Sequence, residues 1–146
     1  MEIAKELTIG KWFGEGVDPL KPEEIGILYR SGKGTRWNLL ARLRDQLEAS
    51  GIPTVWLTEN LDARHRIGEK AAKVTTIHAS KGLQYRAVIL LFAGECPETA
   101  NGETEPEERR LFYVALTRAE DYLVVTWSKK SLFVSEMTQA GKVREV

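Results

Sequence analysis

Three groups of polar side chains follow predicted elements of this sequence, and their chemistry is that of Tyr, Arg, Lys, His, Ser and Gln. One is Arg118, at the end of a predicted helix, and the others span residues 29–33 and 76–84. A cation at a helix C-terminus suits the negative end of the helix dipole, which is the structural interpretation of Arg118. The functional interpretation is that a planar, permanently charged guanidinium on a rigid element is aimed at an anionic group.

The same clusters do not favour a hydrolytic or metal centre. His78 and Ser80 lie two residues apart and have no evident third partner, whereas a hydrolytic dyad needs a base that a further group orients. The histidines and the single cysteine, Cys96, form no spacing typical of a metal site.

A Walker A loop is a third candidate chemistry, because a strand, a glycine-rich turn and a helix follow one another over residues 25–50. The motif requires G-x-x-x-x-G-K-[ST]. Here five residues separate Gly26 from Gly32, and Gly34 follows Lys33 where a magnesium-binding hydroxyl is required. The sequence therefore does not favour a complete ATP-hydrolysing motor in this chain alone.

Composition bounds the remaining possibilities. With 146 residues, 42% hydrophobic and 29% charged, the chain is predicted to be one globular domain. Its 21 basic and 21 acidic side chains cancel, which argues against a stand-alone basic nucleic-acid binder but not against a local basic face. One cysteine fits a reducing compartment, and no apolar run has membrane-spanning length, so we expect a cytoplasmic protein without a membrane partner.

Apolar periodicity predicts that strands and helices alternate. The predicted strands are 25–29, 55–57, 73–77, 86–93 and 122–127, and the predicted helices are 39–47, 106–118 and 131–139. The most apolar run, 86–93, is predicted to be a central strand, and 122–127 a short buried one. This alternation is typical of an α/β fold with a mostly parallel sheet, in which ligands bind at the carboxyl ends of the strands.

Two of the predicted helices carry apolar stripes. The first stripe comprises Leu39, Leu40, Leu43 and Leu47, and the second comprises Leu111, Phe112, Ala115, Leu116 and Ala119. The second helix is predicted to begin near Pro106, because proline suits the first turn and nearby carboxylates face the positive end of the dipole.

Three segments resemble motifs IV, V and VI of superfamily 1 helicases of the UvrD/Rep type. Motif IV is matched by IGILYRSG (25–32). Motif V, T-x-H-x-x-K-G-L-E-[FW], is matched by TTIHASKGLQYRAVIL (75–90), and motif VI, E-E-x-R-L-x-Y-V-x-x-T-R-A, by EERRLFYVALTRAEDYLVV (107–125). Their order and spacing agree with the family over residues 22–127.

The resemblance implies the second RecA-like lobe of such a helicase, called 2A, which is an α/β P-loop-type fold without its own Walker A motif. The lobe would span residues 25–139, with motif IV near 25–32, motif V near 74–85 and motif VI near 107–120. Residues 1–24 would be a leading segment, and residues 140–146 a tail.

For the nucleotide, the resemblance implies five contacts. Arg118 would be the arginine finger that neutralises charge on the transferred phosphoryl group, and Arg30 would reach the γ-phosphate. Tyr29 would stack on adenine, and Gln84 would contact the ribose beside Gly82. The family usually has Glu at the position of Gln84, so this chain keeps a hydrogen-bond acceptor there but loses a charge.

For nucleic acid, the resemblance implies that His78 and Lys81 contact the phosphates of single-stranded DNA, with Thr76 and Ser80 as weaker candidates. The implied function is the C-terminal motor lobe of an ATP-dependent DNA helicase or translocase acting on single-stranded or partly duplex DNA. ATP and Mg²⁺ would be shared with a Walker A/B-bearing lobe of the same parent, the metal would not be ligated by this chain, and the chain alone would be inactive.

Several of these residues also have a purely structural interpretation. Tyr29 could be a core aromatic, Arg30 a solvated charge and His78 a cap on a local backbone group. Arg109 or Arg110 could belong to an exposed helix start or pair internally to orient Arg118. At the level of function, the alternatives are a non-catalytic binding or regulatory module that keeps the lobe fold, and a self-sufficient enzyme that uses Lys33.

Overall fold

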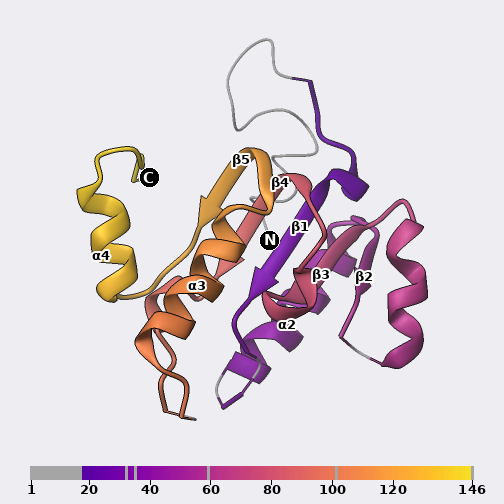
Figure 1. Ribbon diagram of the computed structural model, residues 1–146. Helices are drawn as coiled ribbons and strands as arrows, with labels where there is room; N and C mark the ends of the chain where they lie inside the picture. Colours follow the sequence, from indigo (N-terminus) through magenta and orange to yellow (C-terminus); the bar gives the residue numbers. More distant parts are fainter. Residues whose placement is uncertain (1–17, 32, 35, 59, 101, 146) are drawn as a thin grey trace.

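In the described part of the chain, five parallel strands form one sheet in the order β2-β3-β1-β4-β5 (Figure 1). The computed structural model describes residues 18–31, 33–34, 36–58, 60–100 and 102–145. The strands are β1 (Ile25–Tyr29), β2 (Thr54–Trp56), β3 (Ala72–Thr76), β4 (Tyr85–Leu91) and β5 (Ala119–Val125). The predicted α/β fold with a parallel sheet is confirmed. Most of the predicted leading segment, residues 1–17, lies outside the described residues.

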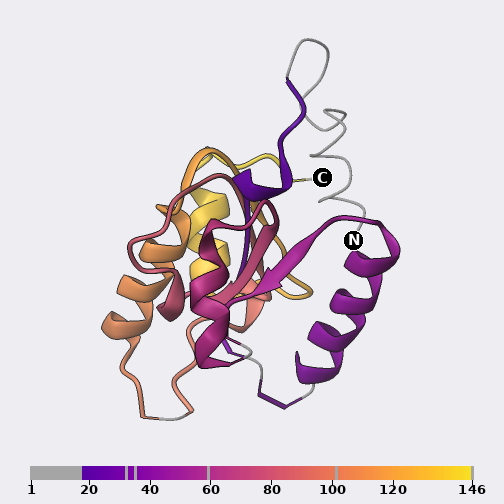
Figure 2. The same cartoon turned by 90° about the vertical axis from the view of Figure 1, so that its right-hand side faces the viewer.

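Helices cover both faces of the sheet. Figure 2 shows the sheet between α2 (Arg36–Ala49) on one side and α3 (Glu105–Leu116) with α4 (Leu132–Gln139) on the other. Four short 3₁₀ helices of the described residues lie in the connections: η1 (Pro22–Glu24), η2 (Leu61–Gly68), η3 (His78–Ser80) and η4 (Ala93–Glu95). The longest of these, η2, occupies most of a segment whose sequence has no clear period. No described helix has both the length and the apolar character that a membrane span requires.

The central strand β1 is buried on both faces, which explains its unbroken apolar run. Ile27 and Tyr29 belong to the core cluster that includes the inner face of α2. Leu28, between them, belongs to the cluster that includes α3 and α4. The alternation of side chains along a strand thus builds two cores, one on each face of the sheet.

Helix α3 begins where its sequence predicts. Thr104 is the N-cap: its hydroxyl accepts a hydrogen bond from the backbone N–H of Glu107, and the Glu107 carboxylate accepts one from the backbone N–H of Thr104. This capping box satisfies two of the orphan donors of the first turn. The helix ends at Leu116, so Arg118 follows the helix rather than lying in its last turn as predicted.

Two sequence-based expectations are wrong in detail, those for β5 and for Leu39. β5 is half exposed rather than buried, because it is an edge strand that pairs with β4 alone among the described strands. β4 is buried and has a strand on each side, as predicted for a central strand, and β1 is the middle strand of the five. In α2, Leu40, Leu43 and Leu47 are buried as predicted, whereas Leu39 is 44% exposed because it points away from the sheet.

The packed core also takes in residues on either side of the strands. Leu20 is buried in the same core cluster as Ile25, so the fold includes residues before position 25. At the other end, Phe133 and Val134 of α4 are buried against the opposite face of the sheet. After α4, residues 140–145 form no helix or strand.

Candidate functional site

The parallel sheet brings the first two predicted clusters to one edge. Tyr29, the last residue of β1, lies opposite Thr76, the last residue of β3. The backbone N–H of Ile77 donates to the carbonyl of Tyr29 over 2.9 Å, so the turn that carries His78 starts directly beside the end of β1. This is the edge at which ligands bind in α/β sheets.

An open hollow of about 540 Å³ lies beside this edge and is bordered by α3. Its lining combines basic and acidic side chains with two apolar ones. The basic residues are Arg30, His78, Lys81 and Arg110; the acidic ones are Glu103, Glu107 and Glu108; Gly102, Leu111 and Val114 complete the lining. Residues from the predicted motifs IV, V and VI therefore meet in one place.

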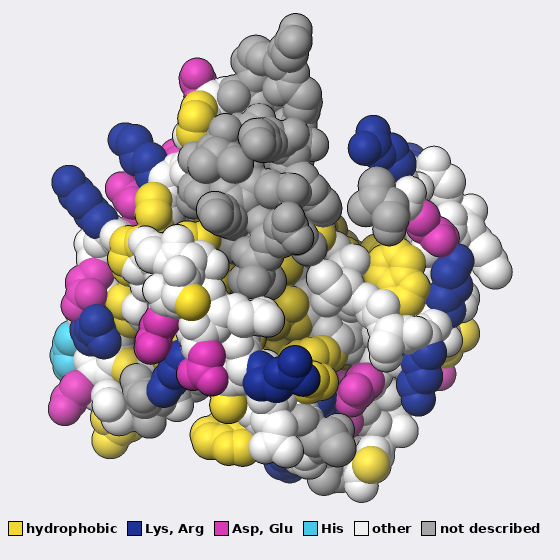
Figure 3. Space-filling view, turned by 180° about the vertical axis from the view of Figure 1, so that it is seen from behind, with side chains coloured by type: hydrophobic (Ala, Val, Ile, Leu, Met, Phe, Trp, Pro, Cys, Tyr) yellow, Lys and Arg dark blue, Asp and Glu magenta, His cyan; other side chains and the backbone are white. Residues whose placement is uncertain are grey.

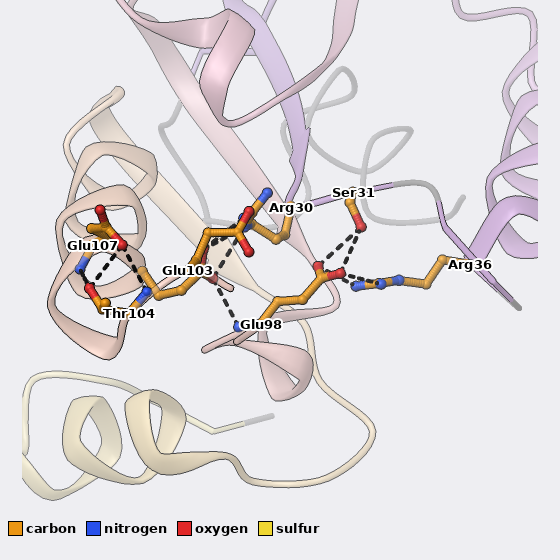
Figure 4. Close-up of polar contacts among 8 residues, drawn as sticks. Arg30, Ser31, Arg36, Glu98, Glu103, Thr104 and Glu107 are labelled. Carbon is orange, nitrogen blue, oxygen red and sulfur yellow. Dashed lines mark hydrogen bonds and ion pairs between the residues drawn. The ribbon is translucent and has the colours of Figure 1, made fainter. Parts of the chain in front are cut away.

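Arg30 is the most buried basic group of the hollow, with 8% of its surface exposed. Its Nε donates to Glu108 Oε1 over 2.9 Å, and its Nη2 donates to the same oxygen over 2.7 Å. Nη2 also lies 3.4 Å from Glu103 Oε1, and Figure 4 shows Arg30 beside Glu103. The hydrogen bonds to Glu108 raise the pKa of Arg30 despite its burial, so the guanidinium stays charged.

Glu108 is held from a second direction. It is 2% exposed, and its Oε2 accepts a hydrogen bond from the backbone N–H of Glu98 over 2.9 Å. The Glu98 side chain in turn binds Ser31 and both terminal nitrogens of Arg36, as Figure 4 shows. Burial acts to raise the pKa of Glu98, but the hydrogen bonds from Arg36 and Ser31 outweigh it, and the pKa lies below its usual value.

His78 and Lys81 are exposed at the rim of the same hollow. Partial burial lowers the pKa of His78, and the positive charges of Arg30 and Lys81 lower it further. His78 is consequently more often neutral near pH 7 than a free histidine. Among the described residues no hydrogen bond occupies either side chain, so both are available to an external group.

Arg118 lies outside the lining of the hollow but contacts its border. Its Nε donates to the carbonyl of Val114 over 3.1 Å, which satisfies one of the open carbonyls at the end of α3. Its Nη1 donates to the carbonyl of Leu83 over 3.3 Å, and its Nη2 to the hydroxyl of Thr117. Arg118 therefore joins the end of α3 to the turn that precedes β4.

The remaining predicted nucleotide contacts are not gathered in the hollow. The ring of Tyr29 is 6% exposed and belongs to the core, and its hydroxyl pairs with Thr58 Oγ1 over 3.0 Å. Gln84 is exposed next to Leu83, the residue that Arg118 holds. Gly82 has φ +83°, a backbone conformation that side chains with a Cβ rarely adopt, so the turn requires glycine there.

Thr76 and Ser80 serve the local turn. The Thr76 hydroxyl accepts a hydrogen bond from the backbone N–H of Ala79, and the buried Ser80 hydroxyl donates to the carbonyl of Ile77. Their side chains shape the turn that presents His78 and Lys81. Any contact of theirs with an external strand would use the backbone.

Glu103, Glu108 and Arg110 belong to this site but are not predicted from the sequence. By charge and position alone, Glu108 and Arg110 are typical of an exposed helix start. A signal for Glu108 exists, since it lies three residues before the apolar pair Leu111 and Phe112 and so falls on the buried side of the helix. Its partner Arg30 is 78 positions away, which no local pattern reveals.

Charged side chains also lie elsewhere on the surface. On the face that Figure 3 shows, basic and acidic side chains both occur among the described residues. Since the formal net charge is zero, the hollow is distinguished by its arrangement of charge and not by an excess of it.

Chemically, the basic side chains of the hollow are groups that can bind an anion. The basic groups of the hollow match the negative oxygens of a phosphate chain. Within the described residues, no three His, Cys, Asp or Glu side chains converge to hold a metal ion.

Known proteins resemble this chain in sequence and in fold. The family model of the UvrD-like helicase C-terminal domain matches residues 43–130. The ATP-dependent DNA helicase UvrD2 of Mycobacterium tuberculosis is 36% identical over 125 residues, covering 71% of this chain and 18% of that protein. A probable DNA helicase II homolog of Mycoplasma capricolum is 39% identical over 79 residues, covering 50% of this chain and 10% of that protein.

Among solved structures, the C-terminal domain of a possible DNA helicase from Lactobacillus plantarum WCFS1 has the same fold. The TM-score is 0.53 and the sequence identity 21%, and the match covers 80% of this chain and 64% of that one. The present chain thus spans less than a fifth of the length of the two relatives matched by sequence.

Proposed function

Because this chain belongs to the family of UvrD-like helicase C-terminal domains, we propose that it is the second motor lobe of an ATP-dependent DNA helicase. In this function the chain supplies the arginine finger and part of the ATP and single-stranded DNA sites. The Walker A lobe of the same parent protein supplies the phosphate-binding loop and the magnesium site. ATP with Mg²⁺ binds between the two lobes.

The observation that carries the proposal is the meeting of three separate segments at one hollow. Arg30 follows β1, His78 and Lys81 follow β3, and Arg110 lies on α3, yet all four line the same space. A single lobe that gathers cationic groups at the carboxyl edge of its sheet, without a Walker A loop, is suited to complete a nucleotide site built mainly by another lobe.

Arg118 is the finger in this proposal. Its described hydrogen bonds go to two backbone carbonyls and a hydroxyl, and none of them goes to a carboxylate. In these contacts no carboxylate offsets the positive charge of the guanidinium, which needs to release only neutral acceptors to reach a phosphoryl group. Such a finger accelerates phosphoryl transfer by about 10³- to 10⁵-fold.

Arg30 serves the γ-phosphate, and the base and ribose are met by other residues. Tyr29 stacks on adenine once its ring is uncovered, and Gln84 meets the ribose beside Gly82. Gln84 donates and accepts hydrogen bonds without charge, so its contact is weaker than that of a carboxylate.

The DNA strand passes along the turn after β3. His78 and Lys81 bind its phosphates, while Thr76 and Ser80 hold the turn and offer backbone contacts. Phosphate contacts position a strand without reading its sequence, which suits a translocating motor. The hydrogen bond from Ile77 to Tyr29 joins this turn to the nucleotide residues, so closure of the cleft on ATP moves the DNA contacts as well.

The test is ATP turnover of the complete helicase in the presence of single-stranded DNA. Arg118→Ala is expected to lower turnover by about 10³-fold or more while ATP binding stays within a few-fold of wild type. Arg42→Ala, an exposed arginine on α2, is the matched control and should turn over normally. Wild-type turnover by Arg118→Ala would remove the finger assignment.

A second candidate is a binding or regulatory module that keeps the lobe fold without the motor role. The carboxylates around Arg30 favour it, because they neutralise the group that a γ-phosphate would need. The two candidates differ in one measurement. If the chain is such a module, ATP turnover by the parent protein does not depend on Arg118.

A further inference from the structure

The two carboxylates that contact Arg30 are not equivalent. Glu108 is buried and forms hydrogen bonds of 2.9 and 2.7 Å to Nε and Nη2. The side chain of Glu103 is 38% exposed and makes a single, longer contact of 3.4 Å to Nη2. One carboxylate is thus part of the packed interior, and the other lies at the surface of the hollow.

We propose that Glu108 is a positioning residue that fixes the guanidinium of Arg30, and that Glu103 is a stand-in carboxylate that a nucleotide phosphate displaces. The inference rests on the proposed function, in which Arg30 meets the γ-phosphate. It gives Glu108 and Glu103 different roles in that function: Glu108 supports the bound phosphate through Arg30, and Glu103 competes with it.

Glu108 is suited to a permanent role because its surroundings hold it from two sides. Besides Arg30, it accepts the backbone N–H of Glu98. The side chain of Glu98 is 11% exposed and is bound by Arg36 and by Ser31, the residue after Arg30. A continuous set of contacts therefore runs from the start of α2, through the loop before α3, to the guanidinium of Arg30.

Glu103 is suited to displacement because its own contacts are poor. Only Oε1 reaches Arg30, and Oε2 is buried without a hydrogen-bond partner among the described residues. An unpartnered buried carboxylate oxygen is costly, so the side chain gains solvation when it leaves. Glu103 also lies in the loop before α3 and lines the hollow, where a phosphate would enter.

The geometry of guanidinium explains why both roles are compatible. Glu108 occupies the edge formed by Nε and Nη2, and a guanidinium offers a second bidentate edge formed by Nη1 and Nη2. Nη2 is the nitrogen that Glu103 contacts. A phosphate that binds the second edge replaces Glu103 and leaves the pair with Glu108 intact.

The first experiment compares ATP turnover of the complete helicase with Glu108→Gln, Glu103→Gln and Glu105→Gln. Glu105→Gln is the matched control, because Glu105 lies on the same helix as Glu108 and pairs only with Arg109 among the described residues. Glu108→Gln should lower kcat about 10-fold or more, since Arg30 loses its fixed orientation. Its KM for ATP should not rise, because removal of a carboxylate does not weaken attraction for phosphate.

Glu103→Gln should change KM and not kcat. The KM for ATP should fall about 2- to 5-fold, as expected when an exposed competing charge is removed. Wild-type kcat in Glu108→Gln would overturn the positioning role, and an unchanged or raised KM in Glu103→Gln would overturn the displacement. If Glu108→Gln does not fold, Glu108→Asp decides, because it keeps the charge but is one methylene shorter. Reduced kcat there supports the proposal, and wild-type kcat overturns it.

A second experiment needs only the present chain and separates this inference from the proposed function. The Nε–H of Arg30 should give a slowly exchanging ¹⁵N resonance in wild type and in Glu103→Gln, and a rapidly exchanging one in Glu108→Gln. Inorganic tripolyphosphate, added as the probe, should shift the Nη resonances of Arg30 more than Nε. Equal exchange of Nε–H in wild type and Glu108→Gln would overturn the inference, even if the helicase hydrolyses ATP as proposed.

Discussion

Arg30 and Arg118 are two arginines proposed to meet the same triphosphate, yet the molecule holds them in opposite ways. Arg30 is buried and surrounded by carboxylates, whereas Arg118 is half-buried and bonded to neutral oxygens. The carboxylates fix the orientation of the Arg30 guanidinium, but they also offset its positive charge. No carboxylate offsets the charge of Arg118 in its described hydrogen bonds, and these bonds are weaker than ion pairs, so its side chain is released more easily. In this account Arg30 is the rigidly positioned arginine of the lobe, and Arg118 is the arginine that moves to the phosphate.

These two settings predict first that the arginines contribute very differently to stability. Arg30→Ala leaves Glu108 as a buried, unpaired charge, which should lower the free energy of unfolding by about 3–5 kcal/mol. Arg118→Ala removes hydrogen bonds to partly exposed acceptors and should cost about 1 kcal/mol. Urea denaturation of the chain measures both. If both variants lose the same free energy of unfolding, Arg30 and Arg118 are not held in different ways.

The sequence predicts the position of Arg118 to within one turn of the helix end, whereas it does not predict the burial of Arg30, and the reason is physical. Most of the setting of Arg118 is local, because an apolar helix, a helix end and a following strand lie within a short stretch of sequence, and only its contact with Leu83 is distant. The burial of Arg30 depends on Glu108, which joins it only when α3 packs beside the end of β1. Local patterns report propensity and amphipathicity, and they do not report which distant charges meet.

The exposure of β5 differs from its prediction for a related reason. Its apolar, β-branched composition is that of a buried strand, but burial depends on a neighbour on each side, and the described sheet ends at β5. The predicted strands of the sheet are nevertheless all present, because an apolar run bounded by turns is sufficient to predict a strand. Sheet order and edge position are properties of the whole fold.

A smaller loss of stability is expected when the N-cap of α3 is removed. This change should affect Arg30, near the start of the helix, and not Arg118, beyond its end. Thr104→Ala removes the N-cap and should lower the free energy of unfolding by about 1 kcal/mol. Because Glu108 lies in the next turn and Arg118 beyond the far end, the Nε–H resonance of Arg30 should exchange faster while the resonance of Arg118 stays as it is. Thr99→Ala, at an exposed loop residue, is the control. A change confined to Arg118 would contradict this prediction.

The smallest expected effect concerns the charge field of the hollow. Lys81→Met should raise the pKa of His78, because the positive charge of Lys81 contributes to its lowering. Arg118→Met should leave it unchanged, since Arg118 does not line the hollow. NMR titration of His78 in the wild type and the two variants measures this. If the pKa of His78 changes in Arg118→Met and not in Lys81→Met, Arg118 and not Lys81 lies near His78, and the prediction is wrong.

The sign of the associated pH dependence follows from the same shift. The folded pKa of His78 lies below the ordinary value of 6.5, so the unfolded chain binds a proton more readily than the folded one. His78 therefore contributes stability above that value and loses it as the pH falls through the folded pKa. His78→Gln should flatten this part of the stability curve.

The function proposed for this chain requires that it completes a nucleotide site and does not form one alone. ATP turnover with single-stranded DNA should be measured for this chain, for the separate Walker A lobe and for the complete helicase, each chain that contains Arg118 being compared with its Arg118→Ala variant. Turnover only in the complete wild-type protein is the predicted result. Turnover by this chain alone, or undiminished turnover in the complete protein with Arg118→Ala, would contradict it.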